Sequence, residues 1–204
     1  MNKLYGFQDE CVEKYGIALY KHIESVFEAL PLGYIINKQL FVVHGGLFQD
    51  QTITIPALQK LNRFQETPMN GPMHDILWSD PMDTEGFESS GRCDNGQTKN
   101  FGTDVTEKFL RENGLRLLIR SHQVQNDGFS ITQNGKCITV FSAPNYMGKV
   151  GNLGALLKIS FDESGQMGDV EFVKFDSVQP FGSTSNQTKK GEEIDTNQPN
   201  EENI

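Results

Sequence analysis

The sequence is poor in cysteine and has no long apolar run. Its three cysteines, Cys11, Cys93 and Cys137, are odd in number, widely separated and without a C-x-x-C spacing. This argues against a disulfide framework or a cysteine zinc site and favours reduced thiols in a cytosolic protein. No apolar run approaches the ~20 residues that cross a bilayer, and the N-terminus lacks the pattern of a secretory signal. We expect a cytoplasmic protein that is also present in the nucleus, with no membrane partner.

Positive charge is also scarce. The 204 residues contain 18 Lys and Arg against 27 Asp and Glu, for a formal net charge of −9. Such an acidic chain has no electrostatic attraction to nucleic acid, so we expect no nucleic-acid partner. The hydrophobic share is low, at 36%, partly because the C-terminal residues are almost all polar. We predict that residues 178–204 form a disordered polar and acidic tail, either regulatory or inert.

Hydrophobic spacing predicts a mixture of helices and strands. Residues 8–30 read as a helix, with a break at Gly16, in which Tyr20, Ile23, Phe27 and Leu30 line one face. Shorter helices are predicted over 56–64 and 104–113, the latter capped by Thr103 and stopped by Gly114. Residues 65–75 and 79–102 read as loops. Strands are predicted at seven places: 34–36, 40–43, 115–120, 128–132, 137–142, 153–160 and 169–175.

Two hydrophobic runs each end by presenting a histidine. Phe41-Val42-Val43 leads into His44-Gly45-Gly46-Leu47, and Leu118-Ile119-Arg120-Ser121 leads into His122. Neutral imidazole is a good ligand for transition metals, and the two glycines let the backbone lie close to whatever His44 touches. The pair predicts a metal site, although a strand-end histidine is also often a hydrogen-bonded structural residue. Two histidines do not complete a site, because a catalytic zinc needs about three protein ligands. Either nearby acids complete it or the chain lacks part of it.

Four short motifs follow one another along the chain. They are His44-Gly45-Gly46-Leu47, Leu77-Trp78-Ser79-Asp80-Pro81, Arg120-Ser121-His122-Gln123-Val124 and Ser142-Ala143-Pro144-Asn145-Tyr146. In order and spacing, residues 1–177 resemble the PPP-type serine/threonine protein phosphatases, and residues 1–7 and 71–77 look closest to the phosphatase 5 branch. The resemblance implies an α+β fold, namely the C-terminal portion of the αββα metallophosphoesterase sandwich of calcineurin-like proteins.

The resemblance also implies a chemistry. Two divalent ions (Mn, Fe or Zn) in the intact domain would activate a water that hydrolyses phosphoserine or phosphothreonine in phosphoprotein substrates, and a regulatory protein is an expected partner. His44 and His122 would be metal ligands. Arg92 would clamp the phosphate. It precedes Cys93 rather than the usual glycine, in a run longer than expected, so a plain surface arginine is the alternative.

Other residues receive roles by the same resemblance. Tyr146 would lie over the metal centre, or else be a core tyrosine. Trp78 would border the substrate groove or anchor the core, and Asp80 would orient site residues. His22 and His74 match no ligand of the family and are expected to be structural or solvent-facing.

Three motifs of the family are not found in these residues. They are Gly-Asp-x-His-Gly, Gly-Asp-x-x-Asp-Arg-Gly and Gly-Asn-His-Glu, which would supply most of the metal ligands, a phosphate-binding arginine and the histidine that protonates the leaving group. We therefore expect residues 1–177 to be the C-terminal part of a catalytic domain, with little or no activity in isolation. The alternative is a non-catalytic, phosphatase-derived binding module, and the coding sequence upstream of Met1 distinguishes the two.

Overall fold

The computed structural model describes residues 1–92 and 97–178. Its centre is a five-stranded sheet in the order β1-β2-β6-β8-β7, made of β1 (Gly33–Ile36), β2 (Leu40–Val43), β6 (Leu117–Arg120), β7 (Phe129–Thr132) and β8 (Cys137–Val140). The inner strands β2, β6 and β8 are parallel. Both outer strands join the sheet antiparallel through short turns. The predicted tail over 179–204 lies outside the described residues.

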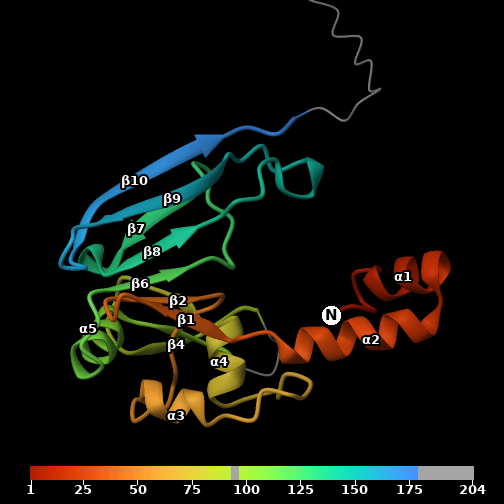
Figure 1. Cartoon of the computed structure of the whole chain (residues 1–204), viewed down its shortest axis with the longest axis horizontal. Helices are drawn as coiled ribbons and strands as arrows, with labels where there is room; N and C mark the ends of the chain where they lie inside the picture. Colours follow the sequence, from red (N-terminus) through yellow and green to blue (C-terminus); the bar gives the residue numbers. More distant parts are fainter. Residues whose placement is uncertain (93–96, 179–204) are drawn as a thin grey trace, which may run out of the picture.

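Two layers cover the faces of this sheet (Figure 1). On one side lies the antiparallel hairpin of β9 (Gly154–Phe161) and β10 (Met167–Phe175). On the other side lie α3 (Ile55–Gln59), α4 (Pro72–Trp78) and α5 (Thr103–Glu112), with a small sheet in the order β3-β5-β4, made of β3 (Asp80–Pro81), β4 (Phe87–Ser89) and β5 (Lys99–Phe101). Short 3-10 turns at Gln133–Gly135 and Tyr146–Gly148 complete the elements.

Alternation along the strands builds two hydrophobic cores. Phe41 and Val43 of β2 pack with Leu118 of β6 in the core under α5. Leu40 of β2 and Ile119 of β6 point the other way, into the core beneath the β9–β10 hairpin. Because side chains alternate between the faces of a strand, a fully apolar run such as Leu117–Ile119 is expected only where both faces are covered.

Several local predictions from the sequence are confirmed. The ranges of the seven predicted strands agree within a few residues, although β3, β4 and β5 lie in the stretch 79–102 that was predicted as loop. Asn37 and Lys38 form the β1–β2 turn with φ of 47° and 55°. The predicted break at Gly16 separates α1 (Phe7–Tyr15) from α2 (Ile17–Ala29), and Gly16 has a φ of 86°. Gly114, with a φ of 65°, ends α5 as expected, because glycine adopts the left-handed conformation without steric cost.

Other local predictions are wrong. Residues 72–78 form α4, although residues 65–75 read as loop. Thr103 does not cap α5: its hydroxyl donates to the Asp83 carbonyl, and Gly102 occupies the cap position. The apolar side chains predicted to share one face of the helix over 8–30 differ in burial: Tyr20 is 4% exposed, Phe27 44% and Leu30 54%. Phe7 of α1 contacts Tyr20 and Phe27, and the α1–α2 pair projects away from the sheets (Figure 1).

No described helix is long and apolar enough to cross a membrane, over residues 1–92 and 97–178.

The packing of β6 yields a stability prediction. Leu118 is fully buried between β2 and β8, so Leu118→Ala should lower the free energy of unfolding by about 2–5 kcal/mol through lost burial and a residual cavity. Leu156 on β9 is 53% exposed, and Leu156→Ala should change it by less than about 1 kcal/mol. Urea unfolding of both variants measures the difference, and equal losses would contradict this packing.

Candidate functional site

His44 and His122 lie side by side at one edge of the central sheet. His44 follows β2 and His122 follows β6, and these strands are parallel neighbours, so their carboxyl ends meet at the same edge. The backbone N–H of Ser121 donates to the His44 carbonyl over 3.1 Å. Nε2 of His44 is 3.0 Å from Nδ1 of His122. The two ring nitrogens are therefore within hydrogen-bond distance of each other.

The backbone at both histidines is specialised. His122 has a φ of 64°, a left-handed conformation that costs a residue with a side chain free energy and that often marks functional positions. After His44, a Cβ on Gly45 would lie 2.5 Å from the backbone of Leu77 and Trp78. Only glycine permits this approach, so the turn after β2 rests directly on the end of α4.

The nitrogen pair fits a shared metal ion as two neighbouring ligands. With metal–nitrogen bonds of about 2.0–2.2 Å, ligands separated by 3.0 Å would subtend an angle of roughly 90° at the ion. Nε2 of His122 is buried and lacks a hydrogen-bond partner within the described part of the chain. The donor set is nevertheless incomplete, because residues 1–92 and 97–178 contain no group of three or more His, Cys, Asp or Glu side chains placed to hold a metal.

Both imidazoles are held in the neutral form that binds metals. Burial of the ring and the positive charge of Arg92 lower the pKa of His122 to about 4, against the ordinary 6.5. Loss of surrounding water lowers the pKa of His44 as well, with a contribution from Arg120. Since ligation requires an unprotonated nitrogen, neither histidine has to lose a proton at neutral pH.

Asp80 joins two arginines beside the histidines. Its carboxylate accepts hydrogen bonds from Nε and Nη2 of Arg92, and from Nη2 of Arg120 over 2.6 Å. Nη2 of Arg92 also lies 3.4 Å from the carbonyl oxygen of His122. The structure thus brings Arg92 and Asp80, both proposed from the sequence, to the edge that carries the histidines.

Arg120 was assigned no role from the sequence. It ends β6, is 1% exposed, and donates Nε to the Gly45 carbonyl over 2.6 Å and Nη1 to Gln123 over 2.7 Å. Burial lowers its pKa while the Asp80 charge raises it. An arginine at the end of the apolar run Leu117–Ile119 was a usable signal, because a buried charge needs a partner.

Trp78 and Tyr146 differ in how they relate to the histidines. The Trp78 indole meets the His122 ring edge to face, at a centroid distance of 5.4 Å and an angle of 87°. Tyr146 stacks edge to face on Phe141 at 5.2 Å and is 42% exposed. No hydrogen bond or ring contact of the described residues joins Tyr146 to either histidine, so its position over the metal centre stays a prediction.

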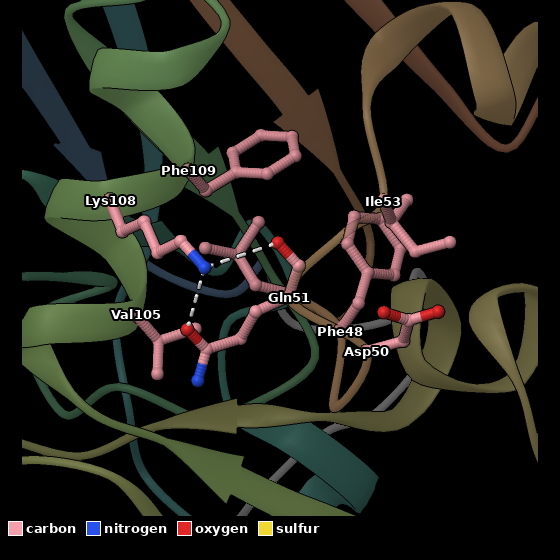
Figure 2. Close-up of a pocket in the computed structure, with 8 residues that line it drawn as sticks. Phe48, Asp50, Gln51, Ile53, Val105, Lys108 and Phe109 are labelled. Atoms are coloured by element: carbon pink, nitrogen blue, oxygen red, sulfur yellow. Dashed lines mark hydrogen bonds between the residues drawn. The ribbon is translucent and has the colours of Figure 1, made fainter.

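A small hollow lies away from this edge. Figure 2 shows it between α5 and the segment after β2, where Lys108 donates to the carbonyl and side-chain oxygens of Gln51. Its other lining side chains include Phe48, Val105 and Phe109. The free volume is about 10 Å³, which holds one water molecule at most. The hollow is therefore a small packing gap, and it contributes nothing to the histidine site.

The fold and the histidine edge define the class of protein. Residues 6–126 match the sequence pattern of the calcineurin-like phosphoesterases, and the chain belongs to this family.

Named relatives narrow the class. The chain is 46% identical over 160 residues to serine/threonine-protein phosphatase T of Trypanosoma brucei brucei, which covers 78% of this chain and 34% of the relative. It is 42% identical over 159 residues to human serine/threonine-protein phosphatase 5, covering 78% of this chain and 31% of that protein. The resemblance to PPP-type phosphatases of the phosphatase 5 branch is thereby confirmed. The chain spans about a third of the length of these relatives.

A solved structure agrees in fold. A protein serine/threonine phosphatase from Saccharomyces cerevisiae, described as similar to human phosphatase PP5, superposes with a TM-score of 0.78 at 37% identity, over 88% of this chain and 57% of that one. The predicted fold class, an α+β part of the metallophosphoesterase sandwich, is confirmed.

The arginine pair yields a second prediction. Asp80→Asn removes the only carboxylate that is hydrogen-bonded to Arg120 among the described residues and leaves a buried guanidinium without a counter-charge. The free energy of unfolding should fall by about 3–5 kcal/mol. Glu171→Gln is the matched control, because the Lys158–Glu171 pair is 64% exposed on both sides and should contribute less than about 1 kcal/mol. Similar losses in the two variants would show that Asp80 does not neutralise Arg120.

The histidines yield a third prediction, on pH. In the metal-free chain, His122 should stay neutral until the pH approaches about 4. Because the unfolded chain takes up this proton near 6.5, the folded state should lose stability as the pH falls from 6.5 towards 4. Long-range ¹H–¹⁵N NMR of the imidazole nitrogens measures the midpoint. A midpoint for His122 at or above 6.5 would contradict the burial of its ring.

Proposed function

We propose that this chain is part of the catalytic domain of a serine/threonine protein phosphatase, which hydrolyses phosphoserine and phosphothreonine in phosphoproteins with a metal-activated water. The observation that carries the proposal is the 3.0 Å approach of His44 Nε2 and His122 Nδ1 at the sheet edge, with an arginine–carboxylate pair beside them. The names of the relatives support it.

Arg92 has the geometry to hold a phosphate group. Its side chain is 30% exposed, and Asp80 and the His122 carbonyl engage only Nε and Nη2. Nη1 makes no hydrogen bond to the described residues. The fixed guanidinium therefore offers free N–H groups next to the proposed metal ligands, and such groups fit phosphate oxygens well.

Divalent ions are the proposed cofactors. A pair of such ions supplies a nucleophilic water at neutral pH and neutralises charge on the phosphate. His44 and His122 would hold one ion, with manganese, iron or zinc as candidates, since imidazole suits these metals. The protein would act on phosphoproteins in the cytoplasm and the nucleus, under control of a regulatory protein.

The described residues would supply two metal ligands, His44 and His122. The three family motifs that carry most of the other ligands do not occur in the 204 residues. We infer that the isolated chain is inactive or nearly so. This same observation favours a second candidate, a non-catalytic module that retains the arginine and tryptophan side of the groove and binds phosphatase partners.

The fourth prediction tests the enzyme proposal. With manganese, the 204-residue chain should hydrolyse p-nitrophenyl phosphate no faster than its His44→Ala variant. Joined to a segment with the three missing motifs, it should regain metal binding and turnover together, because that segment brings the carboxylates and a general acid worth about 10²–10⁴-fold.

The restored protein then separates the roles of two residues. His122→Ala should lower kcat by more than about 10²-fold and reduce bound metal, because it removes a ligand. Arg92→Ala should keep the metal and cost about 10-fold to 10²-fold, as for one charged hydrogen-bond partner. Metal content and kcat are measured on the same samples. Normal turnover after His122→Ala would overturn the ligand assignment, and a restored protein without turnover would favour the binding module.

A further inference from the structure

His74 is a buried histidine whose two ring nitrogens are both engaged. It lies in α4, is 4% exposed, and places Nδ1 3.2 Å from the Pro68 carbonyl and Nε2 2.9 Å from Oγ1 of Thr98. A carbonyl only accepts, so Nδ1 carries the hydrogen, and in the neutral ring Nε2 accepts from the Thr98 hydroxyl. These two partners fix the tautomer and the plane of the ring.

The fixed ring supports Trp78. One helical turn separates His74 from Trp78, and their rings stack at a centroid distance of 6.3 Å with an interplanar angle of 20°. The indole also contacts His122 at a centroid distance of 5.4 Å. Nδ1 of His122 lies within hydrogen-bond distance of His44 Nε2, while the buried Nε2 of His122 has no hydrogen-bond partner among the described residues. Contact with Trp78 is therefore the further restraint on the His122 ring.

Thr98 links the same histidine to the segment that carries Arg92. Thr98 is fully buried, and its carbonyl accepts from the Ser90 N–H over 3.0 Å. The Ser90 hydroxyl in turn accepts from the Arg92 N–H over 3.2 Å. Thr98 therefore connects His74, through its hydroxyl, with Ser90 next to Arg92, through its carbonyl.

A second contact runs parallel to this one. Asp75, the next residue of α4, accepts from the backbone and side-chain N–H groups of Gln49, and Nε2 of Gln49 also donates to the Gln97 carbonyl over 2.8 Å. Adjacent side chains of α4 thus reach the adjacent residues 97 and 98. The His74–Thr98 contact is buried, whereas the Gln49–Gln97 contact is exposed. A buried polar contact is more than core packing requires, since apolar side chains would fill that space without desolvating polar groups.

We propose that His74, held by Thr98, is a positioning residue that keeps the Trp78 indole against His122 and so keeps His122 in the orientation of a metal ligand. This inference rests on the proposed metal site. Residues that orient a ligand from outside the metal's own contacts typically affect metal affinity by about 10–100-fold, and His74 would act in this way through a ring contact.

The chain contains a single tryptophan, so its fluorescence reports on Trp78 alone. Thr98→Val removes the hydroxyl with little change of shape, and Thr98→Ser is the matched control that keeps it. His74→Phe keeps an aromatic ring for the stack but removes both hydrogen bonds. Time-resolved anisotropy of the metal-free chain measures the mobility of the indole. Titration of the restored protein, which carries the three further motifs, with Co²⁺ measures metal binding.

In the wild-type chain and in Thr98→Ser, the anisotropy should decay only with tumbling of the whole molecule. Thr98→Val and His74→Phe should add a fast component, while far-UV circular dichroism stays unchanged. In the restored protein, both variants should bind Co²⁺ about tenfold more weakly. If His74→Phe fails to fold, the two Thr98 variants decide alone. A rigid indole with wild-type Co²⁺ affinity in Thr98→Val would overturn the inference, and so would a mobile indole with unchanged affinity.

Failure of the metal site gives a different result. If the restored protein that carries the three further motifs binds no more Co²⁺ than its His44→Ala control, the proposed metal site is wrong. The metal-free anisotropy then judges the positioning of Trp78 by His74 without reference to any metal.

Discussion

The buried guanidinium of Arg120 is the constraint on which the rest of the site depends. A charge that is 1% exposed is tolerated only when its N–H groups find partners, because an unpaired charge in the interior costs several kcal/mol. Arg120 finds them in the Gly45 carbonyl, the Ser79 carbonyl and the Asp80 carboxylate. These lie after β2, at the end of α4 and in β3. One side chain thereby fixes the relative positions of the segments that carry His44, Trp78 and Arg92.

Close backbone contact makes that arrangement possible. The N–H of Gly45 donates to the Ile76 carbonyl over 2.8 Å, and a Cβ on Gly46 would lie 2.1 Å from the Phe101 ring. A side chain at either glycine would push α4 or β5 away from the end of β2. The distance between His44 and the tryptophan side of the site is therefore set by the absence of side chains at two positions, and the parallel pairing of β2 with β6 then brings His122 to the same place.

What the sequence reveals about this fold depends on how local each signal is. The β1–β2 turn and the two histidines at strand ends were predictable, because turn residues and apolar runs act within a few positions. Helix α4 was missed because Gly71 and Pro72 read as loop, although Pro72 occupies the first turn, where proline is tolerated. The spacing of Tyr20, Phe27 and Leu30 identified one face of a helix without showing what covers it, and only Tyr20 of the three is buried. The roles of Arg120 and His74 depend on partners such as Asp80 and Thr98, far along the chain, which no local pattern indicates.

The charges at the sheet edge suit an anion better than a pair of divalent cations. Around two neutral imidazoles lie two guanidinium groups and one carboxylate, and that carboxylate is already engaged by both arginines. This set carries a net positive charge and attracts a phosphate, but it provides no free anion to balance two divalent cations. A dinuclear centre needs carboxylates for that balance, and within residues 1–92 and 97–178 none stands beside the histidine pair except Asp80. Under the proposed function, this edge would therefore bind the phosphate group but would hold divalent cations only with further acids, which is why metal binding and turnover are expected to appear together when those acids are supplied.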